Sequence, residues 1–171
     1  MFTLLCACIP FFSNEPPLPD AAFKAQLDKT SKQAVEKIES TYKVKCCGFG
    51  GGTMLGIQSC MLAFTLSRPI TIEQARPMII GATEIYRDAI NANKAIRPYL
   101  EEYPFPVSCV EMKFFASDDK SPKDSNYLSS FSQYSLKDNQ VFIFYYVTNK
   151  FDAVLKEPYQ QAQERLNEKN Q

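Results

Sequence analysis

Histidine is missing from this sequence of 171 residues. Its absence excludes catalytic pairs in which a histidine activates a serine or a cysteine, and it excludes zinc or haem sites built on imidazole ligands. It also removes the side chain most often used as a general base near neutral pH. Carboxylates, lysine, tyrosine or an unassisted thiol remain, and none of them forms a recognisable catalytic motif. We therefore assign no catalytic residue, no metal and no cofactor, and favour a protein that is not an enzyme.

An excess of either charge is missing too, because 19 basic and 19 acidic residues cancel. No run of five or six like charges offers a surface for nucleic acid or anionic lipid. No stretch reaches the roughly 18 apolar residues that a membrane-spanning helix needs. The length and the apolar content of 45% instead predict one globular domain.

The first 14 residues, MFTLLCACIPFFSN, contain no charged side chain. Such a segment resembles the hydrophobic part of a secretory signal, although it is short and lacks the usual basic residues before it. Leu5 to Cys8 have the Leu-x-Ala-Cys order of a bacterial lipoprotein signal, in which the lipid would be attached to Cys8. The alternative is that residues 1–14 pack on the domain as an apolar strand or flap. Residues 15–19 form a proline-rich tether, and residues 20–171 form the single globular domain.

Four cysteines lie beyond this leader, at Cys46, Cys47, Cys60 and Cys109. An even number of cysteines is compatible with disulfides in an exported protein. They contain no Cys-x-x-Cys pair, so their spacing does not favour a zinc site. We keep two interpretations open, a disulfide that uses Cys46 or Cys47 and small buried thiols at Cys60 and Cys109.

Hydrophobic periodicity predicts three helices and four strands in the order α-β-α-β-β-β-α. The helices are expected over residues 21–43, from Thr71 to the asparagines near residue 93, and from Asn149 toward the C-terminus. The strands are expected over residues 54–66, 107–116, 128–136 and 140–148. This order predicts an α+β fold in which a mostly antiparallel sheet of about four strands packs with the helices.

Two prolines and one capping pattern refine these helices. Thr71 and Gln74 have the spacing of a capping box at the start of the second helix. Pro77 predicts that this helix either kinks there or begins there. Pro158 is expected to bend the last helix.

The segment CCGFGGGTMLGIQSC, residues 46–60, holds five of the six glycines. It matches neither the dinucleotide fingerprint nor the P-loop, and it follows a helix where phosphate sites precede one. We interpret it as a joint in which Gly48 ends the first helix and Gly50, Gly51 and Gly52 let the chain pass closely into the first strand. The alternative is an exposed loop that binds a small ligand or a peptide.

A rigid corner between prolines holds the aromatic residues Tyr99, Tyr103 and Phe105. Aromatic side chains are enriched at interfaces, so this corner and the glycine segment are the two candidate binding surfaces. Packing in the core is the alternative for the same rings.

The segments IRPYLEEYPF, residues 96–105, and TIEQARPMIIGATEIYRDAINAN, residues 71–93, resemble a family of uncharacterised exported or envelope proteins from chlamydia-like and other intracellular bacteria. The resemblance covers residues 46–115. It implies a location in the bacterial envelope or outside the cell, and it brings no activity with it.

These observations together predict an exported or membrane-tethered bacterial protein that acts as a non-enzymatic binding or structural module. Its partner would be a protein or a peptide, contacted through a sheet edge or through the aromatic corner, with no role for nucleic acid. Two alternatives remain: an enzyme that uses a thiol or carboxylates near the glycine segment, and a cytosolic interaction domain.

Overall fold

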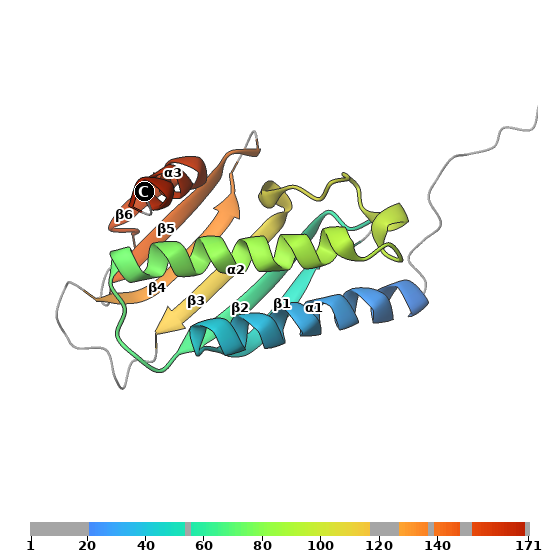
Figure 1. Ribbon diagram of the computed structural model, residues 1–171, viewed down its shortest axis with the longest axis horizontal. Coiled ribbons are helices and arrows are strands. Elements are labelled where there is room, and N and C mark those ends of the chain that lie inside the picture. The colour runs from blue at the N-terminus through green and yellow to red at the C-terminus, as the bar shows by residue number, and fades with distance from the viewer. Residues whose placement is uncertain (1–20, 54–55, 117–126, 137–138, 148–151, 170–171) are drawn as a thin grey trace, which may run out of the picture.

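The computed structural model of the protein describes residues 21–53, 56–116, 127–136, 139–147 and 152–169. Its elements run in the order α1 (Ala21–Tyr42), β1 (Lys45–Gly52), β2 (Ser59–Leu66), α2 (Ile72–Ala92), β3 (Val110–Ala116), β4 (Leu128–Ser135), β5 (Val141–Val147), β6 (Leu155–Pro158) and α3 (Tyr159–Lys169) (Figure 1). Two short 3₁₀ turns, η1 (Arg97–Tyr99) and η2 (Val107–Cys109), lie between α2 and β3.

The six described strands form one sheet in the order β1-β2-β3-β4-β5-β6. Neighbouring strands are antiparallel except β2 and β3, which are parallel and are connected by the crossover that contains α2. The predicted α+β class and the mostly antiparallel sheet are therefore confirmed. The sheet has six strands where the sequence predicted about four, because β1 and β6 were not recognised.

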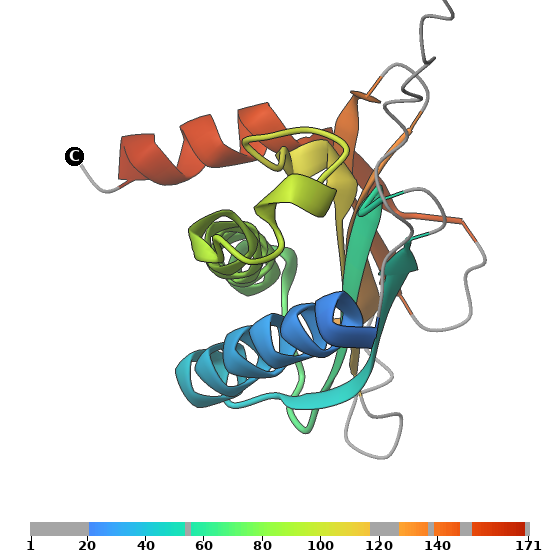
Figure 2. The ribbon, with the colours of Figure 1, turned by 90° about the vertical axis from the view of Figure 1, so that its right-hand side faces the viewer.

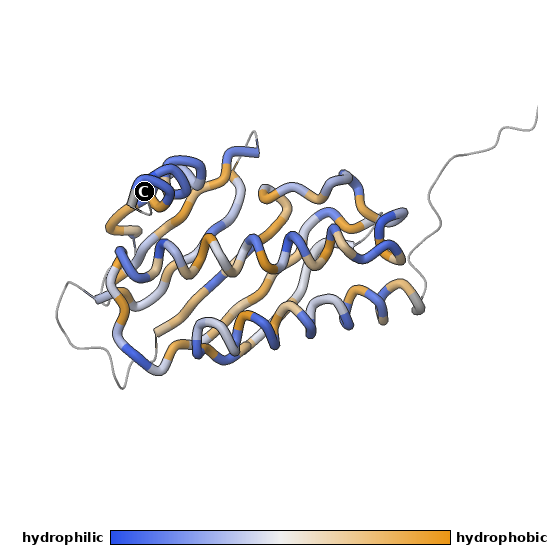
Figure 3. The backbone as a smooth tube through the Cα atoms, viewed as in Figure 1, coloured by the Kyte–Doolittle hydropathy of each residue, from blue (hydrophilic) through white to orange (hydrophobic). Residues whose placement is uncertain are grey.

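All three described helices lie on one side of the sheet, as Figure 2 shows with the sheet seen nearly edge-on. Alternate residues of the strands point to that side and form the core with the helices. The largest fully buried side chains of this core that come from strands are Leu62, Phe64, Leu66, Phe114, Phe131 and Tyr145. Helix α2 alternates between hydrophobic and hydrophilic residues along its length in Figure 3, as expected for a helix that covers a sheet with one side only.

The first two helices agree closely with the sequence prediction. Helix α1 ends at Tyr42, and α2 begins at Ile72 with the predicted capping box, in which the Thr71 amide donates to Gln74 Oε1 at 3.1 Å. Pro77 lies inside α2, so this helix does not begin at Pro77. Pro77 is the sixth residue of α2, and the helix continues past it to Ala92 although proline cannot donate the amide hydrogen bond of that position.

Residues 46–52 of the glycine segment belong to strand β1, so the prediction that Gly48 ends the first helix was wrong. Residues 45–52 pair with β2 in antiparallel register, and Gly48 lies within that strand. The left-handed turn after α1 falls on Lys43, whose φ is 57°. Glycine has a low intrinsic preference for strands, but pairing with a buried central strand overrides that preference.

The last helix begins later than predicted. Its expected N-terminal residue, Asn149, lies outside the described residues. Leu155 belongs to β6, and α3 begins only at Tyr159, directly after Pro158. Proline disfavours a helical conformation at the residue before it, so Pro158 separates the strand from the helix and does not bend a continuous helix.

The hairpin of β4 and β5 confirms the two strands predicted there. The strand predicted over residues 107–116 begins at Val110, because residues 107–109 form η2.

An ion pair is buried between α2 and the β6 edge. Arg76 Nε and Glu157 Oε1 are 2.8 Å apart, and each side chain is only 4% exposed. The Tyr145 hydroxyl donates to the same carboxylate oxygen at 2.5 Å, and Arg165 lies 3.3 Å from the other one. Burial acts to lower the pKa of Arg76, but hydrogen bonds to Glu157 and Glu73 outweigh it, and the net pKa is raised. Arg76 therefore stays charged and fastens α2 to the sheet.

Candidate functional site

The two edges of the sheet, β1 and β6, differ in how open they are to another strand. Strand β6 has four residues, ends in Pro158, which has no amide hydrogen to donate, and continues directly into α3. Strand β1 has eight residues, and no described strand lies on its outer side. An edge of this kind carries backbone groups ready to pair with a further strand.

The first part of β1 is closed and the second part is open. A bulge between Cys46 and Gly48 interrupts the pairing with β2, and the Cys46 amide donates to Glu39 Oε1 of α1 at 2.8 Å. From Gly48 to Gly52 the strand carries one side chain larger than hydrogen, that of Phe49, which is 48% exposed. Charged side chains, which usually protect an edge strand, are absent from this part of β1.

Only one of these glycines is required by packing between the strands. A Cβ atom on Gly51 would lie 2.1 Å from the backbone oxygen of Ser59, so β1 and β2 approach more closely there than any side chain allows. A Cβ atom on Gly48 would meet nothing within 4 Å. Position 48 is neither crowded nor in a positive-φ conformation, so the fold does not require a glycine there.

A groove of about 290 Å³ runs between β1 and α1. We call it the edge groove. One wall is a face of α1 made of Lys24, Leu27, Asp28 and Ser31, which recur at the spacing of a single helix face. The other wall is formed by Phe49, Gly50, Gly51 and Thr53, and Tyr86 of α2 lies at the bottom. The single lysine and the single aspartate cancel, so the groove carries no net charge.

The floor of the edge groove is neutral and able to form hydrogen bonds. The hydroxyl groups of Tyr86 and Ser31 are 2.9 Å apart and share a hydrogen bond. Burial raises the pKa of Tyr86, with a further contribution from Cys60. Burial likewise raises the pKa of Cys60 to about 12, although a hydrogen bond with Tyr86 opposes this shift. Both groups therefore stay protonated at neutral pH.

The four described cysteines are all free thiols. Cys46 is paired opposite Phe64, four residues along β2 from Cys60. Four residues of strand span roughly 13 Å, whereas a disulfide needs Cα atoms less than about 7 Å apart. Cys46 therefore cannot bridge to Cys60 in this fold.

The thiols of Cys46, Cys60 and Cys109 are not activated as nucleophiles. Burial raises the pKa of Cys46 and of Cys109, as it does that of Cys60. A reactive cysteine needs a lowered pKa, so these three thiols give no support to the enzyme alternative. Cys47 is exposed on β1, and Cys8, the predicted site of lipid attachment, lies outside the described residues.

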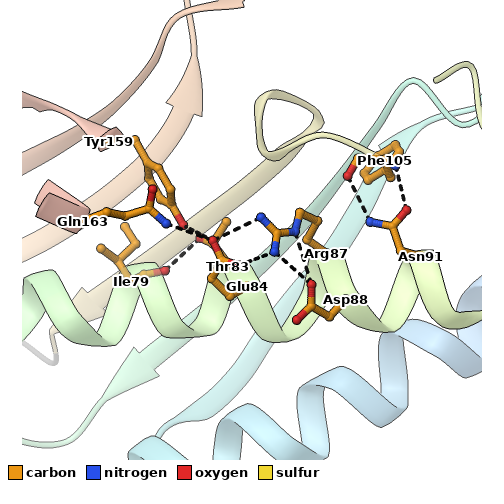
Figure 4. Close-up of polar contacts among 9 residues, drawn as sticks. All are labelled: Ile79, Thr83, Glu84, Arg87, Asp88, Asn91, Phe105, Tyr159 and Gln163. Carbon is orange, nitrogen blue, oxygen red and sulfur yellow. Dashed lines mark hydrogen bonds and ion pairs between the residues drawn. The ribbon is translucent and has the colours of Figure 1, made fainter. Parts of the chain in front are cut away.

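The aromatic corner contributes mostly to the core. The rings of Tyr99 and Phe23 pack with their centroids 4.4 Å apart. Phe105 is 1% exposed, and its backbone exchanges two hydrogen bonds with the Asn91 side chain (Figure 4). Phe105 is therefore not available as a binding surface.

Tyr103 differs from its two aromatic neighbours, because its ring is 49% exposed. The Arg97 guanidinium lies over it at 4.3 Å from the ring centroid. A bridge between Ile57 and Leu100 joins the corner to the glycine segment. The two candidate surfaces are thus neighbours, but they do not form one continuous site.

Within the described ranges, no group of three or more metal-binding side chains is close enough to hold an ion. None of the helices in the part of the chain that the structure describes is long and apolar enough to cross a bilayer.

The sequence indicated the glycines of this site but not their partners. Lys24 of α1 and Tyr86 of α2 both line the edge groove, although they belong to different helices. Their meeting at the edge groove depends on the packing of α1 and α2 on the same side of β1, which no short motif encodes. A signal was nevertheless present in the spacing of Lys24, Leu27, Asp28 and Ser31.

Comparisons of the chain with protein-family models, with curated proteins and with solved structures found no match.

Proposed function

We propose that this protein is a binding module that takes up an extended segment of another polypeptide by strand addition at β1. The observation that carries the proposal is the edge from Gly48 to Gly52 beside the edge groove, on whose outer side none of the described strands lies. In strand addition, main-chain hydrogen bonds supply affinity and pockets for alternate side chains supply specificity. The β1 edge offers the main-chain hydrogen bonds, and the edge groove offers a pocket for side chains.

The geometry favours a bound strand over a compact ligand. No charged side chain protects β1 from Gly48 to Gly52, so a further strand can pair there at about 4.8 Å, the ordinary spacing in a sheet. Every second side chain of such a strand would point toward the helices and enter the edge groove. There it would meet Leu27 and Phe49 on the walls and the hydroxyl groups of Ser31 and Tyr86 below.

We further propose that the module is exported or tethered in the bacterial envelope. The uncharged leader, the Leu-x-Ala-Cys order that ends at Cys8 and the resemblance of residues 46–115 to envelope proteins support this location. A tethered module of this kind would hold its partner polypeptide close to the membrane surface.

Peptides displayed on phage provide the test of strand addition. A random twelve-residue library is selected on the protein, and the selected peptides are synthesised with N-methyl groups at alternate backbone positions. Methylation of the amides that face β1 should abolish binding, because a methylated amide cannot donate, whereas methylation of the intervening amides should leave most of the affinity.

A pair of protein variants locates the bound peptide. Leu27→Glu places a charge in the edge groove and should weaken binding by tenfold or more, by burying an unpaired charge. Ala25→Glu adds the same charge on an exposed position of α1 outside the groove and should leave binding unchanged. The proposal is refuted if the library yields no binder, if both methylation patterns act equally, or if both variants bind alike.

A further inference from the structure

A second cavity lies at the other end of the sheet and takes no part in strand addition at β1. It has a volume of about 670 Å³ and is bounded by η2, the turn between β4 and β5, and the start of α3. Four side-chain amides line it, those of Asn139, Gln140, Gln160 and Gln163. We call it the amide cleft.

The amide cleft has hydrogen-bonding groups but no charge. Tyr159 is its one titratable lining residue. Burial raises the pKa of that hydroxyl, with a further contribution from Glu84, so it stays neutral. Val107, Val141 and Pro158 supply apolar surface between the amides. None of the side chains that line the cleft is charged, and the Glu84 carboxylate beneath Tyr159 and Gln163 is already paired with Arg87, so the cleft favours neutral ligands.

Two of the lining side chains are held in place from below, as Figure 4 shows. Glu84 of α2 accepts a hydrogen bond from the Tyr159 hydroxyl and another from Gln163 Nε2, each at 3.1 Å. Arg87 forms an ion pair with the same carboxylate and also contacts Asp88 at 3.0 Å. The Glu84 carboxylate is therefore fully engaged, and its role is to orient Tyr159 and Gln163.

The hydrogen bonds to Glu84 leave defined groups for a ligand. The Tyr159 hydroxyl donates to Glu84, so its lone pairs remain to accept. Gln163 uses one amide hydrogen on Glu84 and keeps its second hydrogen and its oxygen. Gln160 and Gln163 lie three residues apart in α3, so both side chains project on the same face of the helix.

We propose that the amide cleft binds a small neutral polyhydroxylated ligand, such as a saccharide. A hydroxyl group donates and accepts at one oxygen, and a primary amide offers a donor beside an acceptor, so each amide matches a pair of adjacent hydroxyl groups. The apolar surface of Val107, Val141 and Pro158 suits the carbon-bound hydrogens on the face of a sugar ring. The volume and the mixture of apolar walls with a few oriented polar groups are those of small-molecule sites.

The probe for this proposal is diacetylchitobiose, a neutral disaccharide, titrated into the isotopically labelled protein at millimolar concentration. Chemical-shift changes are expected at the side-chain amides of Asn139, Gln140, Gln160 and Gln163 and at the adjoining backbone. Gln163→Leu should weaken binding by about tenfold, the effect of losing a hydrogen bond or two to the ligand. The matched control Gln161→Leu, at an exposed position of α3 that does not line the cleft, should bind like the unaltered protein.

Three outcomes would overturn the proposal. The first is the absence of shift changes with the disaccharide. The second is an equal loss of affinity in Gln163→Leu and Gln161→Leu, with both variants folded by circular dichroism. The third is binding of a neutral capped dipeptide in the cleft while the disaccharide does not bind, which would assign the cleft to polypeptide. None of these outcomes bears on the β1 edge, so the two proposals are tested separately.

Discussion

Gly51 of β1 and Ser59 of β2 are in such close contact that a Cβ atom on the glycine would lie 2.1 Å from the serine backbone oxygen. Neither a backbone carbonyl nor the strand that bears it can move aside locally. This contact fixes the position of β1 against β2, and with it the position of the open edge.

Gly51→Ala is therefore expected to destabilise the protein by about 1–3 kcal/mol, as overpacking does in other tightly packed sites. Gly48→Ala is the matched control, since nothing lies within 4 Å of its added methyl group. It should change the free energy of unfolding by less than about 0.5 kcal/mol. Urea denaturation followed by circular dichroism measures both variants. Equal effects would show that β1 does not lie against β2 as described.

The four described thiols should differ strongly in reactivity. Cys47 is exposed, whereas Cys60 is buried and has a pKa raised by burial to about 12. With iodoacetamide at pH 8, we expect Cys47 to be alkylated first and Cys60 to stay unmodified until the protein unfolds. Peptide mass mapping after timed quenching follows the reaction. Fast labelling of Cys60 in the native protein would contradict its burial.

Alkylation of the denatured protein, followed by peptide mass mapping, tests whether the exported protein contains a disulfide. After denaturation without reductant, all of Cys46, Cys47, Cys60 and Cys109 should react, because the structure holds them as free thiols. Recovery of a peptide that joins Cys46 to Cys60 would be incompatible with the register of β1 and β2.

Stability should fall at alkaline pH because Cys60 is held as a neutral thiol. Its pKa rises from the ordinary 9.0 to about 12 on folding. The stabilisation is present in full below pH 9 and is lost as the pH rises toward 12, by about 1.4 kcal/mol for each pH unit in that window. Urea unfolding at a series of pH values measures the slope. In Cys60→Ala, the free energy of unfolding should decline less steeply with pH. A part of the decline should remain, because burial also raises the pKa of Tyr86 and of Tyr145.

The buried ion pair gives a comparison between two arginines that contact the same carboxylate. Arg76→Met leaves Glu157 buried without its closest cation and should cost about 3–5 kcal/mol. Arg165→Met removes a cation that is 56% exposed and should cost less than about 1 kcal/mol. Thermal and urea unfolding of both variants provide the measurement. A smaller loss for Arg76→Met than for Arg165→Met would mean that Arg76 does not hold α2 to the sheet.

Much of this fold could be predicted from the sequence, and the two missed strands show where prediction fails. Helices α1 and α2 have long amphipathic patterns, and the β4–β5 hairpin has strong strand formers, so local residues determine these elements. Strand β1 consists largely of glycine and cysteine, and it is a strand only because β2 pairs with it. Strand β6 is four residues long and ends in Pro158, which made it look like the interior of a bent helix.

The candidate site was predictable only in part, because it too depends on contacts between segments that are far apart in the sequence. The glycines of β1 were identified as a candidate surface, but their role as a sheet edge depends on a strand that was not predicted. Tyr103 remains an exposed aromatic residue, whereas Phe105 is buried by hydrogen bonding of its backbone to Asn91, a contact across 14 residues. The Tyr159–Glu84 contact joins residues 75 positions apart, and only the folded chain brings them together.

The parallel pairing of β2 with β3 lies between two antiparallel parts of the described sheet. The first half is β1 with β2, the second half is β3 to β6, and α2 packs on β3 and β4 of the second half and on α1. We expect amide hydrogens of β1 to exchange by opening of the first half alone, while those of β3 and β4 exchange only on global unfolding. Strand β1, which has the open edge, would then open locally more readily than β3 to β6. The amide cleft, which lies beside β5 and α3, would stay intact during that opening.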